Sequence, residues 1–239
     1  MTKQINYFED PATHLPRDPS IFGRPYPAFN QITLTSSDGK SEYDGLQMGF
    51  NGRGARLTFG ASYTLSKTKD NHTNNRGGTP NNAFNLDDEY TDGNADQRHR
   101  FIGNVLATLP YEIQFAAIYF AGSPRTINVS TTRDPFRLGY NGRWLENPAD
   151  CPCTGATVPR NSERTPSDYK LDLRLSKTIR FRSVSVQGIA EVFNVFNTRN
   201  FDRTTYVMNV FSQTYLQPAT STNLFYQPRQ VQVGFRISY

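Results

Sequence analysis

The last eleven residues of the chain alternate strictly between apolar and polar side chains. In "RQVQVGFRISY" every second position is apolar or aromatic, namely Val231, Val233, Phe235, Ile237 and Tyr239. Because successive side chains of a β-strand point to opposite faces, this pattern predicts a strand with one apolar and one polar face. A helix would instead repeat its apolar residues every three or four positions. The chain is therefore constrained to a sheet whose strands each face an apolar environment on one side.

The same period of two recurs in six earlier segments, which we predict as strands. They are residues 43–52, 55–67, 96–109, 113–122, 168–179 and 184–197. The clearest is "DYKLDLRLSKTI", whose two faces are Tyr169, Leu171, Leu173 and Leu175 on one side and Lys170, Asp172 and Arg174 on the other. Strands of about ten residues are longer than the usual five or six. They match the length of about 9 to 11 residues that a membrane-spanning β-strand needs.

The predicted connections alternate in length along the chain. Those after the first, third and fifth strands are very short, whereas the others cover roughly residues 68–95, 123–167 and 198–227. Long structureless loops are uncommon in compact soluble domains. Bacterial outer-membrane barrels, in contrast, have short periplasmic turns and long extracellular loops. We therefore expect an all-β fold, an antiparallel transmembrane β-barrel segment of about seven or eight long strands, with Tyr239 at the periplasmic side.

The composition is consistent with such a sheet and excludes other classes. Hydrophobic residues make up only 36% of the 239 residues, but aromatic residues reach 13%. Intrinsically disordered chains are usually poor in aromatic residues. No apolar run approaches the roughly 18 residues of a transmembrane helix. The formal net charge of +5 is spread along the chain, which favours solvated faces over a nucleic-acid partner.

Five stretches together resemble the C-terminal part of the barrel of TonB-dependent outer-membrane receptors. They are "SEYDGLQMGFNGRGARLTFGASYTLSKTKDN", "ADQRHRFIGNVLATLPY", "RTPSDYKLDLRLSKTIRF", "GIAEVFNVFNTRNF" and "VQVGFRISY". The likeness covers about residues 22–239 and is strongest to the Oar-like branch, whose members carry a carboxypeptidase-regulatory-like domain. It implies a 22-stranded barrel with an N-terminal plug in the cell outer membrane. It also implies uptake of a scarce, bulky ligand with energy relayed by TonB.

The sequence departs from the complete family pattern. It shows about seven or eight strands, no plug, no TonB-contacting segment and no signal peptide, so we expect the last part of a receptor. Residues 1–30 are expected as an irregular loop and residues 31–239 as the C-terminal part of the barrel. The alternative is a self-contained, eight-strand outer-membrane barrel that acts as an adhesin or structural protein. That barrel would use Gln31–Ser36 as its additional strand.

No residue pattern predicts catalysis, a cofactor or a metal. His99 lies between Arg98 and Arg100, close after Asp96, and we interpret these residues as a structural cluster at the barrel rim. An outer-membrane enzyme would need clustered Ser, His and acidic residues at the outer rim, which the sequence does not indicate. Cys151 and Cys153 are spaced too closely for an easy disulfide. We interpret them as incidental or paired thiols in a loop. A metal or redox site is the alternative, with less support.

The resemblance also implies partners. The C-terminal aromatic pattern, Val231, Val233, Phe235, Ile237 and Tyr239, is similar to the signal by which the barrel assembly machinery recognises outer-membrane barrels. Further expected partners are outer-membrane lipid and the remainder of the receptor, with TonB bound only through that remainder. Ion pairs are expected inside the barrel among Lys170, Asp172, Arg174, Glu191 and Arg236. Ligand contacts are expected from the three long loops, but the sequence does not indicate which residues would make them.

Overall fold

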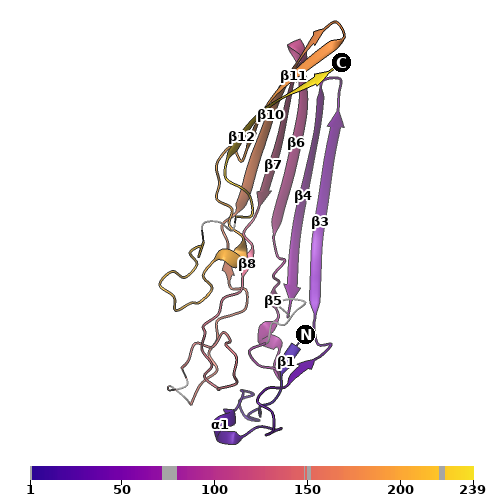
Figure 1. Ribbon diagram of the computed structural model, residues 1–239. Coiled ribbons are helices and arrows are strands. Elements are labelled where there is room, and N and C mark those ends of the chain that lie inside the picture. The colour runs from indigo at the N-terminus through magenta and orange to yellow at the C-terminus, as the bar shows by residue number, and fades with distance from the viewer. Residues whose placement is uncertain (1, 72–79, 148, 150–151, 221–223) are drawn as a thin grey trace.

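Seven long strands form one antiparallel sheet in the computed structural model (Figure 1). The structure describes residues 2–71, 80–147, 149, 152–220 and 224–239. The strands are β3 (Ser41–Arg53), β4 (Leu57–Asp70), β6 (His99–Leu109), β7 (Ile113–Gly122), β10 (Asp168–Phe181), β11 (Val184–Phe193) and β12 (Gln230–Ser238). Their order in the sheet is β12-β11-β10-β7-β6-β4-β3, and the short β5 (Thr91–Asp92) pairs with β4 as an eighth member. The all-β, antiparallel fold with about eight strands is therefore confirmed.

Short and long connections leave from opposite ends of this sheet (Figure 1). Residues 54–56, the 3-10 turn η2 (Pro110–Glu112) and residues 182–183 join neighbouring strands at one end. In two of these turns the chain reverses through a left-handed residue, Tyr111 with a φ angle of 62° and Arg182 with one of 50°. The C-terminus lies at this same end. The alternation of connection lengths and the position of the C-terminus agree with the sequence prediction.

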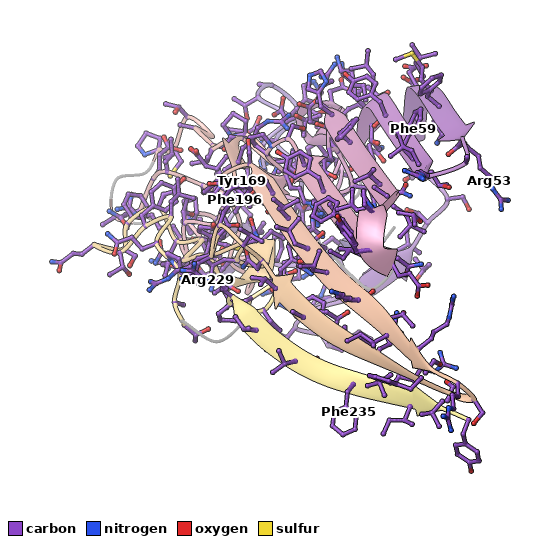
Figure 2. All side chains as sticks on the ribbon, turned by 90° about the horizontal axis from the view of Figure 1, so that it is seen from above. Arg53, Phe59, Tyr169, Phe196, Arg229 and Phe235 are labelled. Atoms are coloured by element: carbon purple, nitrogen blue, oxygen red, sulfur yellow. The ribbon has the colours of Figure 1, made fainter. Side chains whose placement is uncertain are left out.

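The strand register gathers the apolar side chains on one face of the sheet. Leu46 on β3 lies opposite Leu65 on β4, and Leu175 on β10 lies opposite Phe115 on β7. The face continues to the last strand, where Phe235 points away from the sheet (Figure 2). No described layer of protein covers these residues, and many of them are more than one-third exposed. An exposed apolar face of this extent is the surface that a barrel presents to lipid.

The opposite face carries the polar side chains and short-range ion pairs. Arg174 on β10 lies 3.3 Å from Glu191 on β11, and Lys170 lies 2.8 Å from Asp172. These pairs were expected from the sequence, whereas Arg236 lies opposite Gln187 in the register. Apolar residues also lie on this face, among them Ile102, Leu106, Ile118, Phe120 and Ile189. The polar face is therefore less uniform than the alternation predicts.

The buried hydrophobic core lies outside the long sheet, among the segments at its loop end. One cluster contains Tyr7, Ala83, Phe136, Leu138 and Trp144, and a second contains Ile127, Val129 and Tyr206. We call the described parts of residues 2–40, 71–98, 123–167 and 194–229 the loop assembly. It includes the short elements η1 (Asp87–Glu89), β8 (Thr126–Ile127), β9 (Glu163–Arg164) and η4 (Arg203–Thr205). The long connections are thus packed against one another.

The N-terminal segment belongs to this loop assembly. Residues 1–30, expected as an irregular loop, contain β1 (Thr2–Gln4) and α1 (Pro19–Phe22), whose N-terminus is capped by Asp18. β1 pairs with β2 (Thr33–Thr35) in a separate two-stranded sheet. The expectation that Gln31–Ser36 adds a strand to the barrel is therefore wrong, because its backbone pairs with β1 instead. Within the described ranges, no helix has the length and apolar character needed to cross a membrane.

Candidate functional site

The predicted assembly signal forms the outer face of β12. Val231, Val233, Phe235 and Ile237 lie opposite Val192, Ala190, Gly188 and Val186 of β11, and their exposed fractions range from 55% to 79%. Tyr239 is fully exposed just beyond the strand. The structure thus places all five residues on or at the end of one exposed strand. Their recognition by an assembly machinery stays a prediction.

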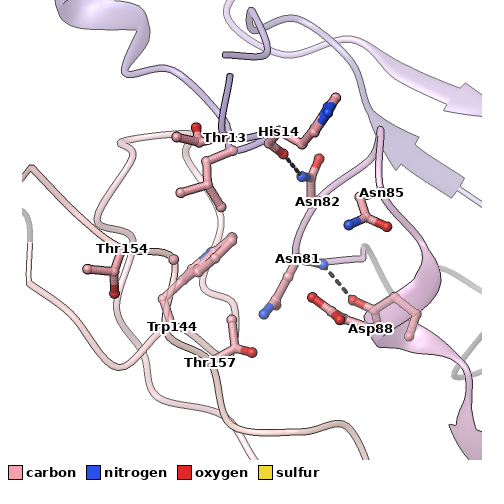
Figure 3. A pocket seen from close by; sticks show the side chains of 12 residues that line it. Thr13, His14, Asn81, Asn82, Asn85, Asp88, Trp144, Thr154 and Thr157 are labelled. Carbon is pink, nitrogen blue, oxygen red and sulfur yellow. Dashed lines mark hydrogen bonds between the residues drawn. The ribbon is translucent and has the colours of Figure 1, made fainter. Parts of the chain in front are cut away.

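A polar pocket of about 220 Å³ lies in the loop assembly (Figure 3). Its buried base includes Asn81, Asn82, Glu89 and Trp144, and its exposed rim includes Thr13, His14, Asp88 and Thr154. The pocket therefore combines the N-terminal segment with two of the three loops from which ligand contacts were expected. No described residue of the third loop, 198–227, lines it. No sequence periodicity marks these positions, so sequence reasoning missed them.

Three hydrogen bonds fix Asn81 at the base of the pocket. Its backbone N–H donates to Glu89 Oε1 at 2.9 Å, and its carbonyl accepts from the Tyr140 hydroxyl at 2.9 Å. Its side-chain Oδ1 accepts from the Arg143 backbone N–H, also at 2.9 Å. That last bond decides the orientation of the carboxamide, because only the oxygen can accept. Among the described residues, the Nδ2 group then has no hydrogen-bond partner.

Trp144 supplies a second buried donor beside Asn81. The indole is only 2% exposed and meets the ring of Phe136 edge-on, with 4.9 Å between ring centroids. Its Nε1 group also lacks a hydrogen-bond partner within the described part of the chain. Both side chains lie against Gly142, where an added Cβ would come within 2.8 Å of Asn81 Oδ1 and 2.9 Å of Trp144 Nε1.

A buried ion-pair cluster forms the wall behind this base. Arg143 Nη2 lies 2.8 Å from Glu89 Oε1, and Arg160 Nε donates to the Glu89 carbonyl at 2.9 Å. Arg160, which is fully buried, also pairs with the Asp70 carboxylate at the end of β4. Buried charges are stable only when they are paired and hydrogen-bonded. The cluster therefore joins the 71–98 and 123–167 loops to the end of the long sheet.

Two ionisable groups hold the segments around the pocket. The Glu146 carboxylate accepts hydrogen bonds from the backbone N–H groups of Thr154 and Gly155, at 2.7 and 2.9 Å. Burial raises the pKa of Glu146, but these hydrogen bonds outweigh burial and leave its pKa lowered. At Tyr140, burial is the main cause of a strongly raised pKa. The Tyr140 hydroxyl therefore stays protonated and donates to Asn81.

The residues considered earlier for chemistry lie apart from this pocket. His99 Nδ1 is 2.7 Å from the Tyr63 hydroxyl, whereas buried Asp96 pairs with Arg164 at 3.1 Å. Cys153 is disulfide-bonded, and Cys151 lies outside the described residues. In the part of the chain that the structure describes, no group of three or more His, Cys, Asp or Glu residues is arranged to hold a metal ion.

Comparison with known proteins gives one family. A family model described as an outer membrane beta barrel domain matches residues 2–117 and again residues 117–232. The two matches together span nearly the whole chain, including the N-terminal segment, six of the seven long strands and the first residues of β12. No curated protein and no solved structure matches it.

Proposed function

Because the chain belongs to the outer membrane beta barrel domain family, and is therefore located in the outer membrane, we propose that it forms the C-terminal part of a TonB-dependent receptor barrel. In this proposal it is a transport component and not an enzyme. Its long loops face the outside of the cell, and its short turns and C-terminus face the periplasm. The five stretches that resemble the Oar-like branch favour this receptor class.

The observation that carries the proposal is the pairing of the two outermost strands. β3 pairs with β4 and β12 pairs with β11, and within the described residues neither strand has a partner on its other side. In the hydrocarbon core every backbone N–H and C=O must be hydrogen-bonded, so a lipid-facing sheet needs both edges paired. Further strands between β3 and β12 would satisfy this requirement. A larger receptor barrel supplies such strands.

The direction of β3 supports the same arrangement. The strand begins at the loop end of the sheet and ends at the turn end (Figure 1). In an up-and-down barrel the strand before it would run the other way and finish at the loop end. Residues 2–40 then correspond to one more long extracellular loop, which explains why they pack with the other long loops. The proposed partners are this remaining barrel with its plug, TonB through that part, outer-membrane lipid and the barrel assembly machinery.

A self-contained small barrel is the second candidate. It would have to close by direct pairing of β3 with β12, since β2 pairs with β1. The packed loop assembly favours a rigid outer surface, which an adhesin would use. A seven-strand closure is nonetheless unusual, because single-chain bacterial barrels have even strand numbers.

Disulfide trapping in native outer membranes separates the two candidates. One cysteine is placed on β3 and one on β12, for example at Gln47 and Gln232, and the two positions are varied along the strands. Cys151 and Cys153 are replaced by serine in this background. The receptor proposal predicts no bond between β3 and β12, but bonds from each strand to other strands of the receptor. Leu46 and Leu65 face each other in the register, so a disulfide between cysteines placed at these two positions should form in either case and serves as the control. Efficient β3–β12 bonds would overturn the proposal.

The energy source is tested separately. Cells that produce the protein are compared, with and without TonB, for their uptake of the ligand that the protein transports. The receptor proposal predicts that the ligand no longer accumulates in the periplasm when TonB is absent, while the amount of the protein in the outer membrane is unchanged. Equal accumulation in both strains would contradict it.

A further inference from the structure

A groove of about 430 Å³ crosses β10, β11 and β12 on the apolar face of the sheet. Ala190 of β11 forms part of its floor and lies between Leu175 of β10 and Val233 of β12 in the register. Gly188, one row nearer the turn end, forms the rest of the floor, and a Cβ added there would meet nothing within 4 Å. The two small residues therefore leave an open groove between taller side chains on the neighbouring strands.

The lining residues place this groove on the face that meets lipid. Most of them belong to the apolar face by their register, namely Ile113, Leu175, Lys177, Gly188, Ala190 and Val233. The others are Ser176, Ile189 and Gly234, which lie between these positions along their strands. Because side chains alternate between the two faces, the backbone of these three residues borders the groove from below.

Lys177 lies at the end of the groove nearest the turns. It is exposed, and its neighbours in the register are Ile113 and Gly188, neither of which carries a charge. Among the described residues it has no ion-pair or hydrogen-bond partner. The other Asp, Glu, Lys and Arg residues on the apolar face of the long strands lie at the loop end. Opposite charges face each other there, in the pairs Asp44 with Lys67 and Glu42 with Lys69.

The position of Lys177 along β10 places it just inside the hydrocarbon region. Phe181, the last residue of the strand, comes four positions later, which is about 13 Å of extended chain. Ile179 and Phe181 lie between Lys177 and the turn on the same face, and both are exposed. A charge on this face is unfavourable unless it reaches the interface or a counter-ion. A lysine meets this requirement by extending its ammonium along the apolar surface to the level of the lipid headgroups.

From the groove and this unpaired charge we propose that the site binds one phospholipid of the periplasmic leaflet. One acyl chain lies in the groove over Gly188 and Ala190, and the phosphate accepts hydrogen bonds from the Lys177 ammonium. The acyl chain buries apolar surface and adds no polar group, which matches the aliphatic walls. The phosphate supplies the negative charge that the neighbouring side chains lack.

The geometry disfavours a protein segment in the groove. β10 and β12 are separated by two strand spacings, about 9.5 Å, whereas a helix with its side chains is about 10–12 Å wide. A strand cannot join the floor, because β11 is already paired on both sides. A second copy in the same membrane orientation would bring no acidic side chain to Lys177, since the acids of this face, Glu42 and Asp44, lie at the loop end. An acyl chain with a phosphate avoids all three conflicts.

The lysine also predicts a headgroup preference. Phosphatidylglycerol has no cation beside its phosphate, whereas phosphatidylcholine carries its own ammonium group. The attraction of one lysine to anionic lipid near a membrane surface corresponds to about fivefold in affinity. We therefore expect Lys177 to select phosphatidylglycerol over phosphatidylcholine by about this factor, while the acyl chain contributes equally in both.

Native mass spectrometry of the intact barrel that contains this chain, purified in an uncharged detergent, measures the binding. The probes are dioleoyl phosphatidylglycerol, dioleoyl phosphatidylcholine and dioleoylglycerol, which has the acyl chains but no phosphate. We expect one phosphatidylglycerol molecule to bind more tightly than any further copies, and about fivefold more tightly than phosphatidylcholine. Dioleoylglycerol should bind more weakly than phosphatidylglycerol.

Charge variants test the phosphate contact. Lys177→Gln should lower the affinity for phosphatidylglycerol about fivefold and leave that for dioleoylglycerol unchanged, whereas Lys177→Arg should preserve both. Arg53→Gln removes the same charge from the polar face at the turn end of β3 and should change neither affinity.

Volume variants test the groove. Gly188→Leu fills it and should lower the affinity for all three probes. Gly49→Leu is the matched control, because Gly49 lies on the polar face of β3 and has equally open space around its Cα. Heat-modifiable mobility in gels confirms that each variant has folded, and the Lys177 variants still test the site if Gly188→Leu does not fold.

Three results would overturn the proposal. The first is a phosphatidylglycerol affinity that Lys177→Gln leaves unchanged, and the second is one that Arg53→Gln lowers equally. The third is a dimer of barrels that Gly188→Leu separates, which would assign the groove to a protein contact. The site requires only an outer-membrane barrel with its short turns toward the periplasm. None of these results therefore bears on the β3–β12 trapping or on TonB dependence, and the two proposals can fail separately.

Discussion

Arg143 and Glu89 form a buried ion pair, with 2.8 Å between Nη2 and Oε1, that joins the 123–167 loop to the 71–98 loop. Both side chains are less than one-tenth exposed. Glu89 also accepts the backbone N–H of Asn81, so the same carboxylate holds the loops together and positions the base of the pocket. The stability of the loop assembly and the geometry of the pocket are therefore coupled through one side chain.

Glu89→Ala is expected to destabilise the loop assembly by about 3–5 kcal/mol, because it leaves buried guanidinium groups without their partner. Urea unfolding followed by Trp144 emission measures this effect. Glu112→Gln breaks an exposed pair with Arg180 at the turn end of the sheet and should leave the unfolding midpoint nearly unchanged. Similar midpoints for the two variants would show that the buried pair does not hold the loops.

Val233→Arg is expected to destabilise the membrane-inserted sheet, whereas Gln232→Arg is not. Val233 lies near the middle of β12 on the apolar face and is 79% exposed, where lipid would surround the new charge. An arginine on the lipid face of a barrel costs about 2–4 kcal/mol at the bilayer midplane. Gln232 lies on the opposite face, across from Glu191. Folding titrations in lipid vesicles of the barrel that contains this chain measure both variants, and equal effects would contradict the assignment of the two faces.

Tyr239→Ala is expected to lower the amount of protein assembled in the outer membrane severalfold. The side chain is fully exposed beyond β12, so its removal takes away no internal packing. Quantitative immunoblotting of outer-membrane fractions measures the effect. Ser238→Ala, which keeps the terminal aromatic residue, is the control. Unchanged levels for Tyr239→Ala would count against an assembly signal at this end.

The segment around residues 154–156 is expected to loosen in acid because of Glu146. Its pKa is lowered in the folded protein by hydrogen bonds from Thr154, Gly155 and Ala156, against the opposing effect of burial. The ionised carboxylate therefore stabilises the fold above its unfolded pKa, and this contribution is lost as the pH falls through the folded pKa. Hydrogen exchange of the Thr154 and Gly155 amides, measured from about pH 6 down to about pH 3, should show falling protection.

Glu146→Gln provides the matched control for that experiment. The amide keeps one oxygen acceptor but has no charge to lose, so protection should be lower at neutral pH and nearly independent of pH across the same range. The same steep acid dependence in the variant would assign the effect to another group.

The alternation of side chains by itself determined the strands and their two faces. Tyr169–Leu175 and Val231–Ile237 show the reason, because a period of two is a local property of the sequence. The short turns also predict the antiparallel pairing of the strands that they join. The alternation of short and long connections further indicated an outer-membrane barrel, because few other folds combine them. The apolar face toward lipid follows from the same pattern.

Only the tertiary structure decided what the long connections do. Asn81, Glu89, Trp144 and Arg160 come from segments without periodicity, and their contacts join residues more than 50 positions apart along the chain. Such contacts depend on which loops meet above the sheet, and no local pattern encodes that. The same holds for Tyr7, which packs into the loop core although its segment was expected to be irregular. The sheet could therefore be predicted from the sequence, but the pocket could not.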